Sequence, residues 1–276
     1  SSIYGGTFPT CPYTKDGLDL GPAWANSLFE DNAEFGYGIM LASKENRANF
    51  IDTLKQTQFS EGVQPFVNKF LQDTDNHKQN RELLQQLNLY FATRVIEDCD
   101  KYLYENLGQL IKPSTWIIGG DGWAYDIGFG GLDHVIASGE NINILVLDTE
   151  IYSNTGGQTS KSTPRGASAK FNQTGKTTKK KDLAAMMMSY QDVYVAQISM
   201  GANPDQAIKA FTEAENYNGP SLIIAYSPCV SHGYDLKYSQ THAFTSVSSG
   251  YNTLFRYNPS KEPSMQIDSV EPFSDY

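Results

Sequence analysis

Residues 114–150 read STWIIGGDGWAYDIGFGGLDHVIASGENINILVLDTE, and they decide the fold. Residues 114–120 predict a short buried strand, the glycine-rich stretch at 125–139 predicts a helix, and the apolar run at 141–150 predicts a second strand. The alternation continues, with a helix expected in 181–191, a strand in 192–200, a helix in 203–219 and a strand in 221–229. Strands that alternate with helices pair in parallel, so we expect an α/β fold: a parallel sheet with helices on both faces.

The flanking sequence predicts loops and an inserted helical segment. Residues 1–40 are rich in Gly, Pro, Asn and aromatic residues, which indicates ordered loops around one short helix at 23–36. Residues 41–112 carry apolar residues at helical spacing and predict a helical insertion with solvated polar faces. A long loop rich in Gly, Ser, Thr and Lys follows residue 150. Near its end, Lys179–Lys181 predict a solvated run before a helix, with docking to an acidic protein as the lesser alternative.

The composition narrows the functional classes. A formal net charge of −10 argues against a general nucleic-acid binder, and no apolar run reaches the roughly 18 residues of a membrane span. The first residues lack the basic-then-apolar layout of a signal peptide. The three cysteines, Cys11, Cys99 and Cys229, lie far apart without a C-x-x-C pair, which favours buried free thiols in a reducing compartment. We therefore expect a cytoplasmic protein that binds neither nucleic acid nor membranes.

Polar residues follow the first two strands at the point where each strand ends. GGDGW (residues 119–123) ends the first strand, and LDTEIYSNTGGQ (residues 147–158) ends the second. In a parallel α/β sheet, ligands bind at the carboxyl ends of the strands. Asp121 and Thr149 offer a carboxylate and a hydroxyl there, and Mg²⁺ prefers such hard oxygen donors. Because Mg²⁺ beside helix N-terminal amides binds a diphosphate, the sequence indicates a site where Asp121 holds the metal rather than touching phosphate.

Two alternatives apply to these glycines. A dinucleotide-binding turn fails on spacing, because no second Gly-x-x-Gly follows Gly120 and Gly122 in register. An acidic residue in a phosphate loop would also repel the ligand unless a cation lay between them. Tight packing between the strand and the helix is the second alternative. For the short GDG stretch alone, packing and metal binding both stay open.

Longer stretches resemble a known family. GDG followed by a spacer and a polar pair resembles the thiamine-diphosphate motif, although Asp148-Thr149 stands where that motif usually has Asn-Asn. The stretches at 119–135 and 143–167 closely resemble the pyruvate:ferredoxin oxidoreductase family. Further similar stretches lie at 21–38, 169–203, 226–233 and 250–259. The resemblance covers nearly the whole chain and is weakest in the helical segment.

The resemblance implies a domain division and a set of site residues. It implies the thiamine-diphosphate-binding fold at 1–233, including the helical segment 41–112, and a C-terminal extension at 234–276. The residues that it implies for cofactor binding are Gly120, Asp121, Gly122, Trp123, Thr149, Glu150, Ile151, Tyr152, Ser153 and Asn154. Those that it implies for the two metal groups are Asp121, Thr149 and the Ile151 carbonyl for Mg²⁺, and Cys229 for a [4Fe–4S] cluster. Asn154 is implied as the catalytic residue, because its amide can donate to a pyruvate carboxylate or to a developing oxyanion.

The same resemblance implies an activity. It is the oxidative decarboxylation of pyruvate to acetyl-CoA and CO₂, with thiamine diphosphate as the cofactor and electrons passing through iron–sulfur clusters. The implied partners are pyruvate, coenzyme A, ferredoxin or flavodoxin, the remaining domains of the same enzyme and a second copy in a homodimer. The family's other cluster ligands and its pyrimidine-binding domain have no match here, so we expect a fragment truncated at both ends and inactive by itself. An organelle such as a hydrogenosome is the alternative to the cytoplasm.

Two rival functions stay open. One is another 2-oxoacid oxidoreductase, linked to flavodoxin or NADP. The other is a non-catalytic remnant of the fold that binds partner subunits. The joint presence of Asp121, Thr149, Asn154 and Cys229 counts against the remnant, because a purely structural module need not keep all of these polar groups.

Overall fold

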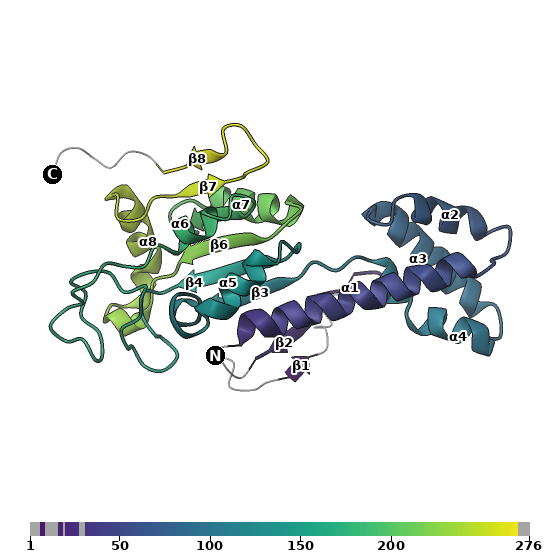
Figure 1. The fold of residues 1–276 in the computed structure, drawn as a ribbon, viewed down its shortest axis with the longest axis horizontal. Coiled ribbons are helices and arrows are strands. Elements are labelled where there is room, and N and C mark those ends of the chain that lie inside the picture. Colours follow the sequence, from purple (N-terminus) through teal and green to yellow (C-terminus); the bar gives the residue numbers. More distant parts are fainter. Residues whose placement is uncertain (1–5, 9–15, 19, 28–30, 270–276) are drawn as a thin grey trace. The chain divides into compact units, whose positions relative to one another are not determined.

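The computed structural model describes residues 6–8, 16–18, 20–27 and 31–269. The chain divides into two compact units, each described by itself. The sheet unit comprises Ser1–Gly5, Ser27–Tyr37 and Ser114–Tyr276, and the helical unit comprises Gly6–Asn26 and Gly38–Pro113. Figure 1 labels most of the helices and strands of both units.

The sheet unit contains a six-stranded sheet in the order β3-β4-β6-β5-β7-β8. Its strands are β3 (Trp116–Gly120), β4 (Asn143–Asp148), β5 (Tyr194–Ile198), β6 (Ser221–Tyr226), β7 (Phe255–Tyr257) and β8 (Met265–Ile267). The strands β3, β4, β6 and β5 pair in parallel, whereas β7 pairs antiparallel with both β5 and β8. The four strands predicted from the sequence are therefore confirmed as the parallel part of the sheet.

Helices cover both faces of this sheet, as predicted. The helices of the unit that follow β3 are η3 (Gly122–Ile127, a π-helical turn), α5 (Phe129–Ala137), α6 (Leu183–Met188), α7 (Pro204–Asn216), η4 (Val230–His232), η5 (Leu236–Tyr238) and α8 (Ser239–Ser248). Alanines of α7 pack on the sheet face that carries Tyr194 and Ile223. Leu183 of α6 instead lines a cavity together with Gln197 and Ile224, which strand alternation places on the opposite face.

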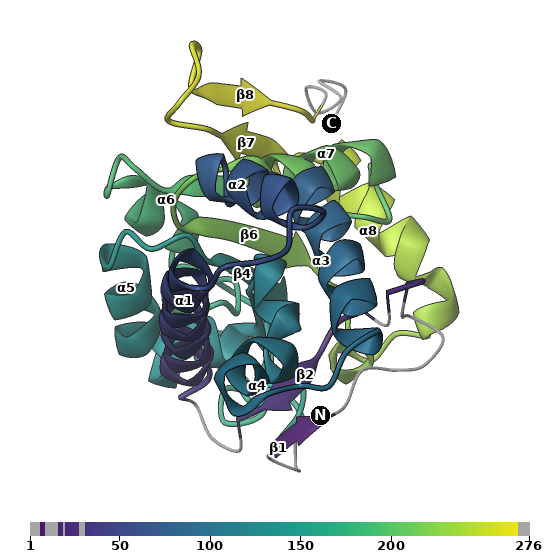
Figure 2. The same cartoon turned by 90° about the vertical axis from the view of Figure 1, so that its right-hand side faces the viewer.

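The C-terminal residues continue the same sheet. Figure 2 shows β7 and β8 at one edge of it, beyond β5. Arg256 of β7 is buried and donates to Asp268 at 2.8 Å and to Glu213 of α7 at 2.7 Å, so a partly buried ion cluster fastens this edge to a helix. The division at residue 233 into a cofactor domain and an extension stays a prediction.

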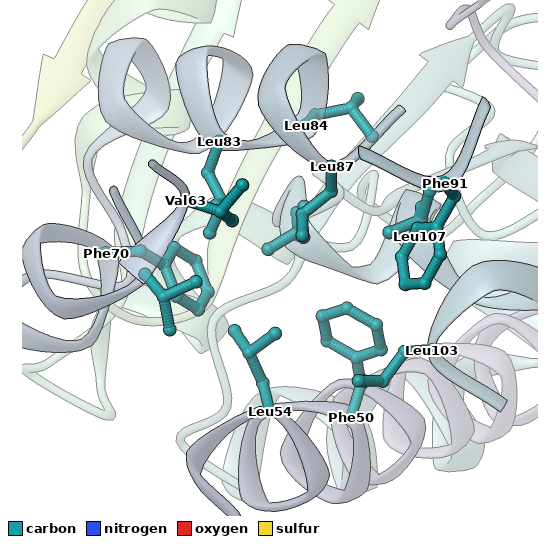
Figure 3. Packing of buried hydrophobic residues seen from close by; sticks show 12 residues of the cluster. Phe50, Leu54, Val63, Phe70, Leu83, Leu84, Leu87, Phe91, Leu103 and Leu107 are labelled. Carbon is teal, nitrogen blue, oxygen red and sulfur yellow. The ribbon is translucent and has the colours of Figure 1, made fainter. Parts of the chain in front are cut away.

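The helical unit is built around one apolar cluster, shown in Figure 3. Its elements are β1 (Gly6–Phe8), β2 (Trp24–Asn26), the part of α1 (Asn32–Gln56) from Gly38 onward, α2 (Gln64–Gln72), α3 (His77–Ala92), α4 (Asp98–Glu105) and η2 (Leu107–Leu110). The cluster includes Phe50, Leu54, Val67, Phe70, Leu83, Leu87, Phe91, Leu103 and Leu110. The helical spacing of these residues in the sequence therefore predicted the segment correctly.

The short helix expected at 23–36 is wrong in type and extent. Residues Trp24–Asn26 form strand β2, and α1 begins only at Asn32 and then runs to Gln56. Gly36 and Gly38 made this stretch resemble a loop, yet both lie inside the helix. A Cβ at Gly36 would lie 2.6 Å from Ile117 Cγ1, so the glycine permits close packing of α1 on β3.

None of the helices in the described ranges has the length and apolar character needed to cross a lipid bilayer.

Candidate functional site

Asp121 and Thr149 meet at the carboxyl edge of the sheet. Asp121 directly follows β3, Thr149 directly follows β4, and these two strands are parallel neighbours. Thr149 Oγ1 lies 2.8 Å from Asp121 Oδ1, and the Thr149 backbone N–H donates to the same oxygen at 3.3 Å. The structure thus brings together two residues that lie far apart in the sequence.

The Thr149 hydroxyl lies among several oxygens. Besides Asp121, Thr149 Oγ1 lies 2.9 Å from Ile151 O and 2.7 Å from Ser153 Oγ. A hydroxyl has one proton, whereas Asp121 Oδ1 and Ile151 O are both acceptors, so Thr149 can donate to only one of them. The carboxylate, hydroxyl and carbonyl oxygens therefore converge as ligands of a hard cation do. Within the described part of the chain, no three His, Cys, Asp or Glu side chains form a metal-binding group, so such a cation would depend on hydroxyl and carbonyl oxygens.

The second carboxylate oxygen of Asp121 accepts from two serines that the sequence did not predict. Ser160 Oγ donates to Asp121 Oδ2 at 2.9 Å, and Ser162 Oγ donates to the same atom. Both serines are buried and come from the long loop between β4 and α6. The buried Lys176 holds this part of the loop, because its Nζ donates to Ser160 O at 3.0 Å and to Thr163 O at 2.6 Å. The hydroxyl-rich composition of the loop was the available signal.

Asp121 is a buried carboxylate without a cationic partner among the described residues. Its exposed fraction is 2%. Burial raises the pKa of Asp121 above its ordinary value and the nearby Asp148 raises it further, although the hydroxyl donors oppose the shift. A buried carboxylate in this setting favours a proton or a metal ion as its counter-charge.

A second polar network surrounds Asp148 and Glu150, the residues that precede and follow Thr149 in the sequence. Lys180 Nζ lies 2.6 Å from Asp148 Oδ2 and 2.9 Å from Glu150 Oε1. The Tyr125 hydroxyl donates to Asp148 at 2.9 Å, and the Tyr251 hydroxyl donates to Glu150 at 2.9 Å. Burial disfavours the charged form of Lys180, but the two carboxylates outweigh it and raise the pKa of the ammonium group. The Glu150 side chain, predicted to bind cofactor, is thus engaged in this network.

The prediction of a solvated run at Lys179–Lys181 is wrong for two of its three residues. Of the three, only Lys179 is exposed, and Lys180 and Lys181 are partly buried. Lys180 pairs with buried carboxylates, and Lys181 Nζ lies 3.1 Å from the centre of the Phe129 ring while donating to Tyr125 O at 3.1 Å. The pairing residues come from β3–α5 and β4, so the sequence around the lysines gave no sign of them.

The glycine-rich turn packs closely against the loop that follows β4. A Cβ at Gly122 would lie 2.3 Å from the Tyr152 ring, and the Tyr152 hydroxyl donates to Gly122 O at 3.2 Å. At Gly120, among the residues that the structure describes and apart from the two chain neighbours, none has an atom within 4 Å of such a Cβ. Trp123 is buried and its indole N–H has no hydrogen-bond partner among the described residues. Asn154 is exposed in the loop.

The turn that contains Cys229 lies against the same loop. Cys229 Sγ lies 3.2 Å from Ser153 Oγ, and a ring nitrogen of His232 lies 2.8 Å from Thr149 O. Burial opposes ionisation of Cys229, but hydrogen bonds with Ser153 and Ser231 outweigh it and lower the pKa of the thiol. Cys229 is a free cysteine.

Two further cysteine predictions remain untested. The prediction for Cys11 falls outside the described residues. Cys99 lies in α4.

Known proteins are similar to this chain in sequence. Residues 108–225 match the family described as "Thiamine pyrophosphate enzyme, C-terminal TPP binding domain". The chain is 50% identical to a pyruvate:ferredoxin oxidoreductase of Moorella thermoacetica, over 94% of this chain and 23% of that protein. It is 48% identical to a pyruvate-flavodoxin oxidoreductase of Klebsiella pneumoniae, over 99% of this chain and 24% of that protein. A mitochondrial pyruvate dehydrogenase [NADP(+)] of Euglena gracilis is 46% identical, over 98% of this chain and 16% of that protein.

The matched proteins are much longer than this chain, which spans about a quarter of the first two relatives. The resemblance stated from the motifs is confirmed along almost the whole sequence. The chain is a homologue of one segment of the pyruvate:ferredoxin and pyruvate-flavodoxin oxidoreductases, and its residues 108–225 match the C-terminal TPP-binding domain of thiamine pyrophosphate enzymes.

Proposed function

We propose that this chain holds the diphosphate group of thiamine diphosphate and a Mg²⁺ ion in a pyruvate oxidoreductase. The proposed reaction converts pyruvate and coenzyme A to acetyl-CoA and CO₂ and releases two electrons, which pass through iron–sulfur clusters to ferredoxin or flavodoxin. The proposal depends above all on the convergence of the Asp121 carboxylate, the Thr149 hydroxyl and the Ile151 carbonyl. The names of the relatives support the choice of pyruvate.

The donor set fits Mg²⁺. Asp121 supplies one negative charge, and Thr149 and Ile151 supply neutral oxygens, while water and the cofactor's diphosphate oxygens would complete the octahedron. The hydroxyls of Ser160 and Ser162 bind the second carboxylate oxygen of Asp121, whereas the first accepts from Thr149, so the first is the oxygen that would face the metal beside Thr149. Partners of this kind fix the orientation of a metal ligand.

Other residues take proposed roles around the bound cofactor. Thiamine diphosphate supplies a nucleophilic thiazolium carbon when it is bound. Asn154, exposed in the loop beside the Mg²⁺ oxygens, would donate its amide N–H to the substrate carboxylate or to a developing oxyanion. Cys229 would give one thiolate to a [4Fe–4S] cluster, and a cluster usually takes four. Its Sγ contacts the Ser153 hydroxyl, which in turn contacts the Thr149 hydroxyl. The proposed cluster ligand therefore adjoins the proposed metal site.

Calorimetry with thiamine diphosphate and Mg²⁺ tests the assignment in the complete protein. Asp121→Ala should abolish the Mg²⁺-dependent part of cofactor binding, because it removes the charged ligand. Asp192→Ala is the matched control, since Asp192 is exposed and lies in the turn before β5. Binding by the Asp121 variant that equals the wild type would refute the metal site.

A second candidate function is that of an oxidoreductase with a different electron acceptor or a different 2-oxoacid substrate. The NADP-linked relative favours an enzyme that passes its electrons to NADP, and the flavodoxin-linked relative favours flavodoxin. Assays of the complete protein with pyruvate, 2-oxoglutarate and oxaloacetate, each with ferredoxin, flavodoxin and NADP, distinguish these cases. No activity with any pair, together with no cofactor binding, would instead favour a non-catalytic remnant.

A further inference from the structure

Asp148 and Glu150 flank Thr149 in the sequence, and one lysine binds both of their carboxylates. Lys180 Nζ lies 2.6 Å from Asp148 Oδ2 and 2.9 Å from Glu150 Oε1. The Thr149 side chain instead contacts Asp121 and the Ile151 carbonyl. Of these three consecutive residues, Asp148 and Glu150 are therefore held by Lys180, whereas Thr149 is held by its contacts with the other proposed metal ligands.

The backbone at this point needs such support. Glu150 has a φ of +62°, in the left-handed region that residues with side chains rarely adopt. Its carbonyl accepts from Thr163 Oγ1 at 2.6 Å, and its carboxylate is bound by Lys180 and by the Tyr251 hydroxyl. Because Glu150 lies between two proposed metal ligands, Thr149 and Ile151, its conformation decides whether their oxygens point to one place.

Charge and burial make Lys180 difficult to replace. The side chains of Asp148 and Glu150 are 5% and 8% exposed, and that of Lys180 is 28% exposed. Without the ammonium group, two buried carboxylates would lie close together without a cation, with the Tyr125 and Tyr251 hydroxyls and the Glu150 backbone N–H as their donors. Buried like charges repel strongly, so either one carboxylate would take up a proton or the peptide between them would move, and both outcomes change how the two side chains are held.

We propose that Lys180 is a positioning residue for the metal site. It contacts neither Asp121 nor the oxygens of Thr149 and Ile151, and it acts on them by holding Asp148 and Glu150. Lys180 also ends the long loop that supplies Ser160 and Ser162, so one contact fixes both segments around Asp121. The inference rests on the proposed Mg²⁺ function and adds a residue that the sequence placed on the surface.

The alternative is that Lys180 only stabilises the fold, and Arg256 provides the control for it. Arg256 is also a cation between two carboxylates, Glu213 and Asp268, in the same sheet unit, and it is more deeply buried than Lys180. It lies on β7, away from the strands that carry Asp121 and Thr149. Arg256→Met should therefore lower the melting temperature and leave the affinity of the folded protein for Mg²⁺ unchanged.

The experiment measures the dissociation constant of Mg²⁺ in the presence of thiamine diphosphate, in the complete protein. Lys180→Met should weaken Mg²⁺ binding by about 10- to 100-fold, as loss of a partner that orients metal ligands does. Lys180→Arg should restore most of the affinity, because a guanidinium also bridges two carboxylates. With Mn²⁺ in place of Mg²⁺, water-proton relaxation should show more metal-bound water in the Lys180→Met protein, because a displaced Thr149 hydroxyl is replaced by water.

The outcomes separate the inference from the proposed function. A wild type without Mg²⁺-dependent cofactor binding, or an Asp121→Ala variant that keeps it, overturns the metal site itself. If Asp121→Ala loses binding while folded Lys180→Met keeps wild-type affinity and water count, Lys180 has no positioning role. Should the Lys180→Met protein not fold, Lys180→Gln is judged by the same criteria, since its amide keeps a donor but carries no charge.

Discussion

The Tyr125 hydroxyl donates a hydrogen bond of 2.9 Å to Asp148 Oδ2, and this contact joins the turn after β3 to the end of β4. Both groups are buried. Asp121 and Thr149, the proposed metal ligands, lie beside these two residues on the same segments. The contact therefore holds together the two chain segments whose oxygens meet at the candidate site.

Removing this hydroxyl should destabilise the sheet unit. We expect Tyr125→Phe to lower the free energy of unfolding by about 1–2 kcal/mol, because a buried carboxylate loses a donor while Lys180 still pairs with it. Urea denaturation measures the loss. Tyr190→Phe is the control, since its hydroxyl donates to Asp133 at 2.8 Å in an exposed position and should cost little. Equal losses in the two variants would contradict the argument.

The helical unit should depend on the cluster shown in Figure 3. Leu87 of α3 is fully buried in it, so Leu87→Ala should lower the free energy of unfolding by about 2–5 kcal/mol. Leu89 lies on the same helix and is 62% exposed, so Leu89→Ala should change it by less than about 0.5 kcal/mol. Denaturation followed by circular dichroism compares them. A large loss at Leu89 would mean that this face of α3 is covered in solution.

Sequence periodicity predicted most of the fold. The strands β3 to β6 are long enough to show apolar runs between helical patterns, and their alternation with helices fixed the parallel sheet. The strands β7 and β8 have three residues each, too few for a pattern, and they were not predicted. The start of α1 was hidden because Gly36 is needed for packing on Ile117, a reason that only the folded chain reveals.

The site was predicted only where topology requires it. Asp121 and Thr149 follow neighbouring parallel strands, so the sheet itself brings them together. Ser160, Ser162 and Lys180 belong to a long loop without periodicity, and their contacts with Asp121 and Asp148 arise from the tertiary path of that loop. No local pattern distinguished the partly buried Lys180 from the exposed Lys179 beside it.

Tyr226 should make the stability of the protein fall at high pH. Burial raises the pKa of Tyr226 from 10.0 to about 12, and the nearby Glu150 adds to the shift. The folded state then keeps a proton that the unfolded state releases, so stability is complete below about pH 10 and is lost as the pH rises toward about 12. Tyr226→Phe should reduce this loss, measured as the change in urea midpoint between about pH 9 and about pH 11. The exposed Tyr238→Phe should behave as wild type, and an unchanged pH dependence in Tyr226→Phe would refute the assignment.

Gly122 should be required for the conformation of the loop that carries the proposed metal-binding oxygens. In Gly122→Ala the new Cβ would lie 2.3 Å from the Tyr152 ring, so Tyr152 and the adjoining Ile151 must move. We expect the free energy of unfolding to fall by about 1–3 kcal/mol. The affinity for Mg²⁺ with thiamine diphosphate should fall roughly tenfold, as with other lost support of a metal ligand.

Gly120→Ala provides the comparison for Gly122→Ala, because, apart from its two chain neighbours, no described residue has an atom within 4 Å of a Cβ at Gly120. Its stability without cofactor should stay near wild type. If Gly120→Ala then loses cofactor affinity alone, the ligand itself approaches Gly120, as expected for a diphosphate bound at the end of β3. If Gly122→Ala keeps both wild-type stability and wild-type affinity, contact between the turn and Tyr152 does not support the site.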